Sequence, residues 1–135
     1  MNLSLNLKWS RLKNKMEITP SELGKLGEET AVKFLRQKGY HIKERNYTFG
    51  KGELDIIALD GDTTVFVEVK SRQNLEMGDP VYSVTPAKVK QIKKIAEFYL
   101  YDRNINEIDC RFDVVTVLFS EDMTPVIEHY VNAFD

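Results

Sequence analysis

The chain has 135 residues, a length that suits a single domain. Its composition, 42% hydrophobic and 30% charged, is ordinary for a soluble globular protein. A single cysteine, Cys110, excludes an internal disulfide framework, and no apolar run reaches membrane-spanning length, so we expect a cytoplasmic protein without a membrane partner. The formal net charge of −2 gives no evidence for nucleic-acid binding, which would need a local basic patch.

Residues 1–18 are polar and aperiodic and carry several lysines and an arginine, namely Lys8, Arg11, Lys13 and Lys15. This composition predicts a flexible basic N-terminal tail, followed by a single domain over residues 19–135. The tail is either an arm that binds nucleic acid or a dangling extension, and the second interpretation is preferred.

The first predicted helix begins after Thr19 and ends before Gly39. Thr19 suits the N-cap, Pro20 the first helical position, and Glu22 closes a capping box. Within the helix, two glycines, Gly24 and Gly27, lower helix propensity, and close packing against a sheet is the expected compensation. Glu28 falls at the border of the buried face.

A strand is predicted from Tyr40 to Phe49, and a hairpin from Gly52 to Arg72. In the hairpin, two runs rich in β-branched and apolar residues flank Asp60-Gly61-Asp62, a typical turn sequence. Side chains of a strand alternate between faces, which places Leu54, Ile56 and Ala58 together on the first strand and Val65, Val67 and Val69 together on the second.

Asp55, Glu68 and Lys70 fall on one face of this hairpin in either of two registers. With Gly61-Asp62 as the loop, Asp55 faces Glu68; with Asp60-Gly61 as the loop, Glu68 lies diagonal to it. Two carboxylates so placed repel each other unless a cation lies between them or one binds a proton. A solvated strand face is the alternative, but the apolar neighbours of Glu68 disfavour it.

The remainder of the chain reads as a loop over residues 73–84, a second helix capped by Thr85, and strands over 111–119 and 126–134. The apolar stripe predicted for the helix comprises Val89, Ile92, Ile95, Ala96 and Tyr99. Asp113 either supports a functional site or pairs with Arg111, and pairing is preferred. The predicted order is therefore α-β-β-β-α-β-β, an α/β domain with a mixed sheet flanked by helices.

Four lysines of the second helix lie mainly outside its apolar stripe: Lys88, Lys90, Lys93 and Lys94. Such a run either contacts nucleic-acid phosphates or is a plain solvated face, and the sequence favours phosphate contact only slightly.

Asp55, followed by Glu68 and Lys70 across a hairpin, resembles the PD-(D/E)-x-K nuclease superfamily, which includes restriction endonucleases and archaeal Holliday junction resolvases. The longer string, from Gly52-Glu53-Leu54-Asp55 through Phe66-Val67-Glu68-Val69-Lys70-Ser71-Arg72, resembles one branch of it, the uncharacterised bacterial YraN-type family. The resemblance extends from about Glu22 to Phe134. It implies a restriction endonuclease-like core and a single nuclease-like domain.

The resemblance further implies a metal-dependent endonuclease that hydrolyses phosphodiester bonds. Asp55 and Glu68 would bind Mg²⁺ or Mn²⁺, because hard oxygen ligands suit these ions. Lys70 would position the attacking water or neutralise the phosphate, and Glu28 would be an accessory carboxylate, unless it is an ordinary helix-surface residue. The expected substrate is nucleic acid, with DNA preferred and branched DNA a candidate.

The alternative is a non-catalytic module that keeps the nuclease fold and binds nucleic acid or another protein. The sequence leaves the oligomeric state open, a homo-oligomer included.

Overall fold

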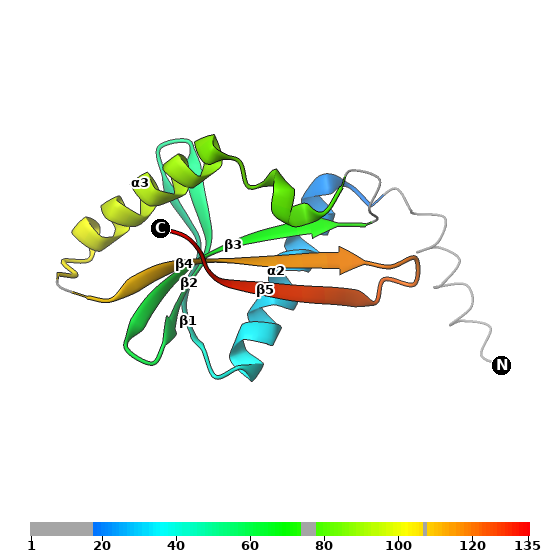
Figure 1. Ribbon diagram of the computed structural model, residues 1–135, viewed down its shortest axis with the longest axis horizontal. Coiled ribbons are helices and arrows are strands. Elements are labelled where there is room, and N and C mark those ends of the chain that lie inside the picture. The colour runs from blue at the N-terminus through cyan, green and yellow to red at the C-terminus, as the bar shows by residue number, and fades with distance from the viewer. Residues whose placement is uncertain (1–17, 74–77, 107) are drawn as a thin grey trace.

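The structure, a computed structural model, describes residues 18–73, 78–106 and 108–135, which form a five-stranded sheet with a helix on each face (Figure 1). Of the predicted N-terminal tail, only Ile18 is among the described residues. The elements in chain order are α2 (Pro20–Gln37), β1 (His41–Phe49), β2 (Gly52–Asp60), β3 (Thr63–Arg72), the 3-10 helix η2 (Pro80–Ser83), α3 (Pro86–Asp102), β4 (Cys110–Phe119) and β5 (Pro125–Phe134).

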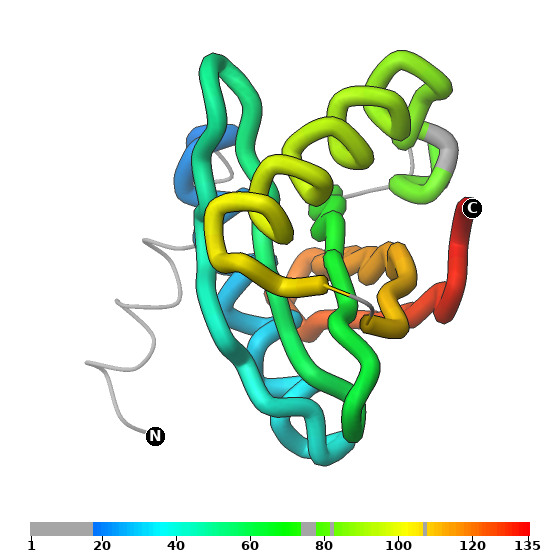
Figure 2. Tube along the Cα trace, turned by 90° about the vertical axis from the view of Figure 1, so that its left-hand side faces the viewer, coloured from blue at the N-terminus to red at the C-terminus, as the bar shows by residue number. Residues whose placement is uncertain are grey.

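The strands lie in the order β1-β2-β3-β4-β5, with β3 and β4 parallel and every other neighbouring pair antiparallel. Parallel neighbours need a long crossover, and α3 supplies it. The sheet twists strongly, so that in Figure 2 β1 and β2 stand upright while β4 and β5 run roughly along the line of sight, in opposite directions. The predicted mixed sheet and the order α-β-β-β-α-β-β are confirmed; η2, within the predicted loop, is an addition.

The sheet is buried on both faces. On the α2 face, β2 and β3 contribute Ile56, Ala58, Val65 and Val67 to one apolar cluster. On the opposite face, Phe66 and Ile57 pack with Ile92, Ile95 and other residues of α3 in a second cluster. Burial on both faces explains why residues 65–69 read as an almost continuous apolar run.

Both predicted helix starts are confirmed. The Thr19 side chain accepts a hydrogen bond from the Glu22 N–H at 3.1 Å, and the Thr85 side chain accepts one from the Lys88 N–H at 3.2 Å. Gly39, which follows α2, has a φ of +91°, a left-handed value that favours glycine after a helix. No helix in the described part of the chain is both long and apolar enough to cross a membrane.

The hairpin adopts the first of the two predicted registers. Asp60 pairs with Thr63, which leaves Gly61-Asp62 as the two-residue loop, and the pairs continue to Ile56 and Val67. Gly61 has a φ of +58°, as a tight hairpin turn of this kind requires.

The predicted position of Leu54 is wrong: it packs in the cluster against α3 with Ile57, not beside Ile56 and Ala58. The strand alternation breaks at Asp55, which takes part in neither adjacent ladder. Across from it, Asn46 lies between the paired residues Arg45 and Tyr47 and has a φ of +54°. This left-handed residue rotates β1 locally, so the faces exchange at the level of Asp55.

The two glycines of α2 differ. Gly27 is buried, and a Cβ there would collide with the Ser71 side chain on β3, which confirms the expected close packing. At Gly24 a Cβ would meet no atom of the described residues within 4 Å, so the packing expected there is wrong.

Candidate functional site

Asp55 lies where β2 and β3 separate. The ladder between these strands ends at Ile56 and Val67, and beyond it Asp55 Oδ2 accepts a hydrogen bond from the Val69 N–H at 2.8 Å. A side-chain carboxylate thus takes the place of a backbone carbonyl. This contact holds the Asp55 carboxylate at β3, one residue from Glu68.

Glu68 is buried, with 4% of its side chain exposed. Its Oε1 atom lies 3.5 Å from Lys70 Nζ and 3.8 Å from Lys88 Nζ. Its Oε2 atom is buried and has no hydrogen-bond partner among the described residues. Buried polar atoms in folded proteins nearly always have a partner, so this oxygen indicates a missing ligand such as a water or a cation.

The two carboxyl groups affect each other's ionisation in opposite directions: the charge of Glu68 raises the pKa of Asp55, whereas a hydrogen bond with Asp55 lowers that of Glu68. Burial, together with the charge of Glu68, raises the pKa of Asp55 to about 7, although the Val69 N–H opposes the shift. Burial also raises the pKa of Glu68, against the opposing charges of Lys88 and Lys70. At neutral pH, therefore, full ionisation of the pair requires more positive charge than these two lysines supply.

Glu28, on α2, is held toward the same place. Its Oε1 atom accepts hydrogen bonds from Arg45 Nε at 3.0 Å and Asn46 Nδ2 at 3.1 Å, and 12% of its side chain is exposed. Arg45 also pairs with Glu29 at 2.7 Å. The border position expected for Glu28 is confirmed, and two donors from β1 fix its carboxylate.

An open hollow of about 440 Å³, here called the acidic hollow, brings Glu28 and Asp55 together. Glu53 adds a third carboxylate, and Lys25 is its one basic residue. The full lining is Ser21, Gly24, Lys25, Glu28, Asn46, Glu53, Asp55 and Val69. Glu68 and Lys70 do not line this hollow, but Glu68 interacts with Asp55 and lies 3.5 Å from Lys70, so both adjoin the hollow at Asp55.

The four lysines predicted on α3 do not act as one group. Lys88 points to Glu68, at 3.8 Å, from the first turn of the helix. Lys90 and Lys94 are exposed, and Lys94 lines a separate hollow beside Phe49. Lys93 lines a third hollow beside Phe112. Only Lys88 is thus part of the carboxylate cluster.

The donor set fits a hard divalent ion. Among residues 18–73, 78–106 and 108–135, no three histidine, cysteine or acidic side chains form a metal-binding group. Mg²⁺ is commonly held by one or two carboxylates together with waters, and Asp55 with the unpartnered Glu68 Oε2 supplies such a pair.

Two residues that contribute contacts to the site were not expected from the sequence. Asn46 donates a hydrogen bond to Glu28, and Lys88 forms an ion pair with Glu68. Asparagine is the residue type, after glycine, that most readily adopts a left-handed backbone, so Asn46 within a predicted strand was a usable signal. The contact between Lys88 and Glu68 joins a helix to a strand 20 residues away and had no local signal.

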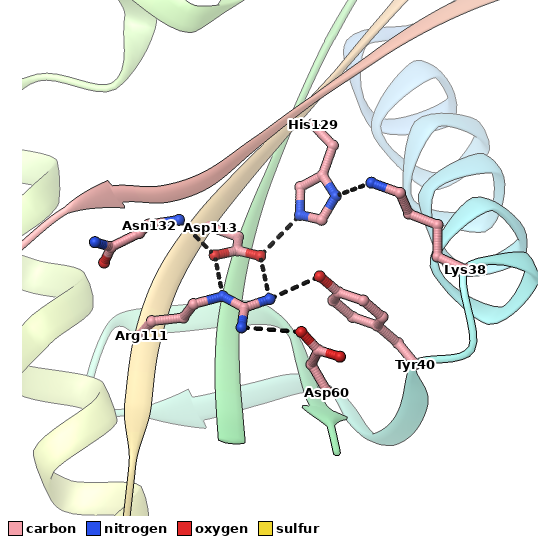
Figure 3. A network of polar contacts seen from close by, with 7 residues as sticks. All are labelled: Lys38, Tyr40, Asp60, Arg111, Asp113, His129 and Asn132. Carbon is pink, nitrogen blue, oxygen red and sulfur yellow. Dashed lines mark hydrogen bonds and ion pairs between the residues drawn. The ribbon is translucent and has the colours of Figure 1, made fainter. Parts of the chain in front are cut away.

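Asp113 lies in a separate polar network (Figure 3). Its carboxylate, fully buried, accepts hydrogen bonds from Arg111 Nε at 3.0 Å and the Asn132 N–H at 2.9 Å, and its Oδ2 lies 2.7 Å from His129 Nε2. The preferred pairing of Asp113 with Arg111 is confirmed. Arg111 also contacts Asp60 at 3.0 Å and the Tyr40 hydroxyl at 2.6 Å.

Comparison with known proteins identifies relatives over most of the chain. The model of the Uncharacterised protein family UPF0102 matches residues 27–117. A UPF0102 protein of Chlorobium limicola is 47% identical over 124 residues, which is 88% of this chain and 96% of the relative. A UPF0102 protein of Dictyoglomus turgidum is 48% identical over 99 residues, 73% of this chain and 84% of the relative. These matches confirm the family resemblance found in the sequence.

Proposed function

The chain belongs to the UPF0102 family, and on this premise we propose that it is a metal-dependent endonuclease that hydrolyses phosphodiester bonds in nucleic acid. DNA is the proposed substrate, and branched DNA is one form to test. One observation carries the proposal: two carboxylates, Asp55 and Glu68, share a site in which Glu68 Oε2 is buried without a partner.

Asp55 and Glu68 would hold Mg²⁺ or Mn²⁺ through their carboxylate oxygens. When bound, the ion would lower the pKa of a water and offset negative charge on the phosphate. The protein contributes a fixed pair of ligands, since the Val69 N–H orients Asp55 and two lysines flank Glu68.

Lys70 and Glu28 are suited to the remaining tasks. Lys70 lies 3.5 Å from Glu68, and 24% of its side chain is exposed, so its ammonium can reach a phosphate or an attacking water while it stays beside the ligand. Glu28 faces the acidic hollow with one oxygen held by Arg45 and Asn46, which leaves the other oxygen able to accept a hydrogen bond from water.

A cleavage assay tests the proposal. The full-length protein would be incubated with single-stranded, duplex, flapped and four-way branched DNA, and with RNA, in Mg²⁺, Mn²⁺ or EDTA. We expect metal-dependent cleavage of at least one substrate, and a loss of about 100-fold or more in Asp55→Asn, Glu68→Gln and Lys70→Ala. Asp62→Asn, at the exposed hairpin turn, is the matched control and should cleave like wild type.

Two results would contradict the proposal: no cleavage of any substrate in either metal, or equal cleavage by wild type and Asp55→Asn. Binding without cleavage would favour the non-catalytic module instead.

A further inference from the structure

Gly24 occupies an exposed position of α2 where glycine has no evident structural use. Glycine lowers helix stability more than any residue except proline. Gly27 is explained by the Ser71 side chain that packs over it, whereas a Cβ at Gly24 would meet no described atom within 4 Å. Gly24 caps neither end of the helix, since it lies inside Pro20–Gln37, whose N-cap is Thr19 and whose C-cap is Lys38. A ligand that approaches the helix backbone closely would explain it.

Two hollows meet at Gly24. The acidic hollow lies on one side, with Glu28 and Asp55. On the other side is a hollow of about 430 Å³, here called the basic hollow, whose charged residues are Lys70 and Arg72. Gly24 and Val69 line both hollows. A linear ligand could therefore pass from one hollow to the other between Gly24 on α2 and Val69 on β3.

The basic hollow presents polar groups that the described residues leave without partners. Arg72 Nε and Ser71 Oγ are buried, and neither has a hydrogen-bond partner within the described part of the chain. Arg72 Nη1 donates to the Ser71 carbonyl at 3.1 Å, which fixes the guanidinium against β3. The guanidinium of Arg72 and the ammonium of Lys70 line the basic hollow together, and two such cations match the charge of a phosphate.

We propose that a nucleic-acid strand crosses α2 over Gly24, with one phosphate at the acidic hollow and a neighbouring phosphate bound by the cations Arg72 and Lys70 in the basic hollow. This inference rests on the proposed function and assigns the path of the substrate. The charges of the two hollows support this assignment. In the acidic hollow the carboxylates would face a phosphate bound through the metal ion, whereas in the basic hollow the phosphate would contact the cations directly. The absence of a side chain at Gly24 lets the sugar-phosphate backbone approach the helix.

The test separates stability from binding, using full-length Gly24→Ala. Melting temperature would be measured by thermal unfolding, and affinity by fluorescence anisotropy of a labelled, hydrolysis-resistant oligonucleotide in Mg²⁺. Alanine should raise the melting temperature by about 2–5 °C, because it improves helix propensity without a clash. It should weaken binding by about fivefold or more, and Gly24→Leu should weaken it further.

Two further variants complete the test. Arg72→Gln should weaken binding by about tenfold and reduce the salt dependence by the equivalent of about one phosphate contact. Gln37→Ala, an exposed position of α2 that lines neither hollow, is the control and should leave affinity unchanged.

A lower melting temperature in Gly24→Ala would overturn the inference, since it would mean that the protein's own chain packs on this glycine. A higher melting temperature with unchanged affinity would overturn it as well. If wild type binds no oligonucleotide, the strand path and the proposed function fail together. If wild type binds without cleaving and Gly24→Ala weakens binding, the hydrolysis proposal fails while the strand path stands.

Discussion

Two buried carboxylate clusters of this protein differ in how their charge is satisfied. Asp113 accepts hydrogen bonds from Arg111 and the Asn132 N–H and contacts His129. Burial alone would raise the pKa of Asp113, but the contacts with His129 and Arg111 hold it below the ordinary value. Burial raises the pKa of both Asp55 and Glu68, and the charge of Glu68 raises that of Asp55 further.

The contrast separates a carboxylate that supports the fold from the two carboxylates to which the proposed function assigns a metal ion. The Asp113 network uses its oxygens within the protein, whereas one Glu68 oxygen is buried without a partner among the described residues. Strongly perturbed acidic groups in a hollow are typical of functional sites, and a satisfied network is typical of structure. The predictions below test this division.

The largest expected effect on stability comes from Asp113→Ala. Removal of a fully buried carboxylate leaves Arg111 and His129 without their shared partner, which should cost about 3 kcal/mol or more. The melting temperature should fall by about 10 °C. Thermal unfolding of the variant, with the exposed Asp62→Ala as control, measures this. A fall of only 1–2 °C would show that the network contributes little to the fold.

Asp55→Asn should instead raise the free energy of unfolding. In the unfolded chain Asp55 ionises near pH 4, but in the metal-free fold its pKa is about 7. Between these values unfolding releases a proton, so the Asp55 contribution to wild-type stability falls as pH rises. The variant should match wild type near pH 4 and exceed it by about 1–2 kcal/mol at pH 8.

Chemical denaturation of both proteins in EDTA from pH 4 to pH 8 checks this difference. Subtraction of the two curves removes the contributions of the titrating groups that do not interact with Asp55, and leaves those of Asp55 and its neighbour Glu68. A variant that is less stable than wild type at pH 8 would place Asp55 with Asp113 as a structural carboxylate.

The smallest expected effect is on nucleic-acid affinity, from lysines of α3 that contact neither cluster. Arg111 forms an ion pair with Asp113, and Lys88 forms one with Glu68. Among the ion pairs of the described residues, Lys90, Lys93 and Lys94 pair with neither carboxylate. Replacement of these last three by glutamine should weaken oligonucleotide binding modestly and flatten its salt dependence, with no change in melting temperature. An unchanged salt slope would identify them as a plain solvated surface.

Much of the fold followed from local signals. Thr19 and Thr85 marked the helix starts, and the turn at Asp60-Gly61-Asp62 limited the hairpin to two registers. Both registers placed Asp55 near Glu68, and the two do interact, although the alternation on which that expectation rested breaks at Asp55 itself.

The features of the fold and the site that the sequence did not predict depend on contacts between residues far apart in the chain. The left-handed Asn46 reverses the strand faces beside Asp55 and moves Leu54 to the other core. The Asp113 network forms because β4 and β5 shift register between Phe112 and Val114, which brings the Asn132 N–H to Asp113. Such irregularities are decided by packing across the sheet, so strand alternation alone could not predict them.

The central claim is that Asp55 and Glu68 form a site for a divalent cation, and thermal unfolding with and without metal tests it most directly. Wild-type protein and Asp55→Asn would be melted at pH 8 in EDTA, Mg²⁺ and Mn²⁺, with Asp62→Asn as the exposed control. Binding to the native state alone should raise the melting temperature of wild type and the control at millimolar metal, and not that of Asp55→Asn. A wild-type melting temperature that is the same in EDTA and in both metals would contradict the claim.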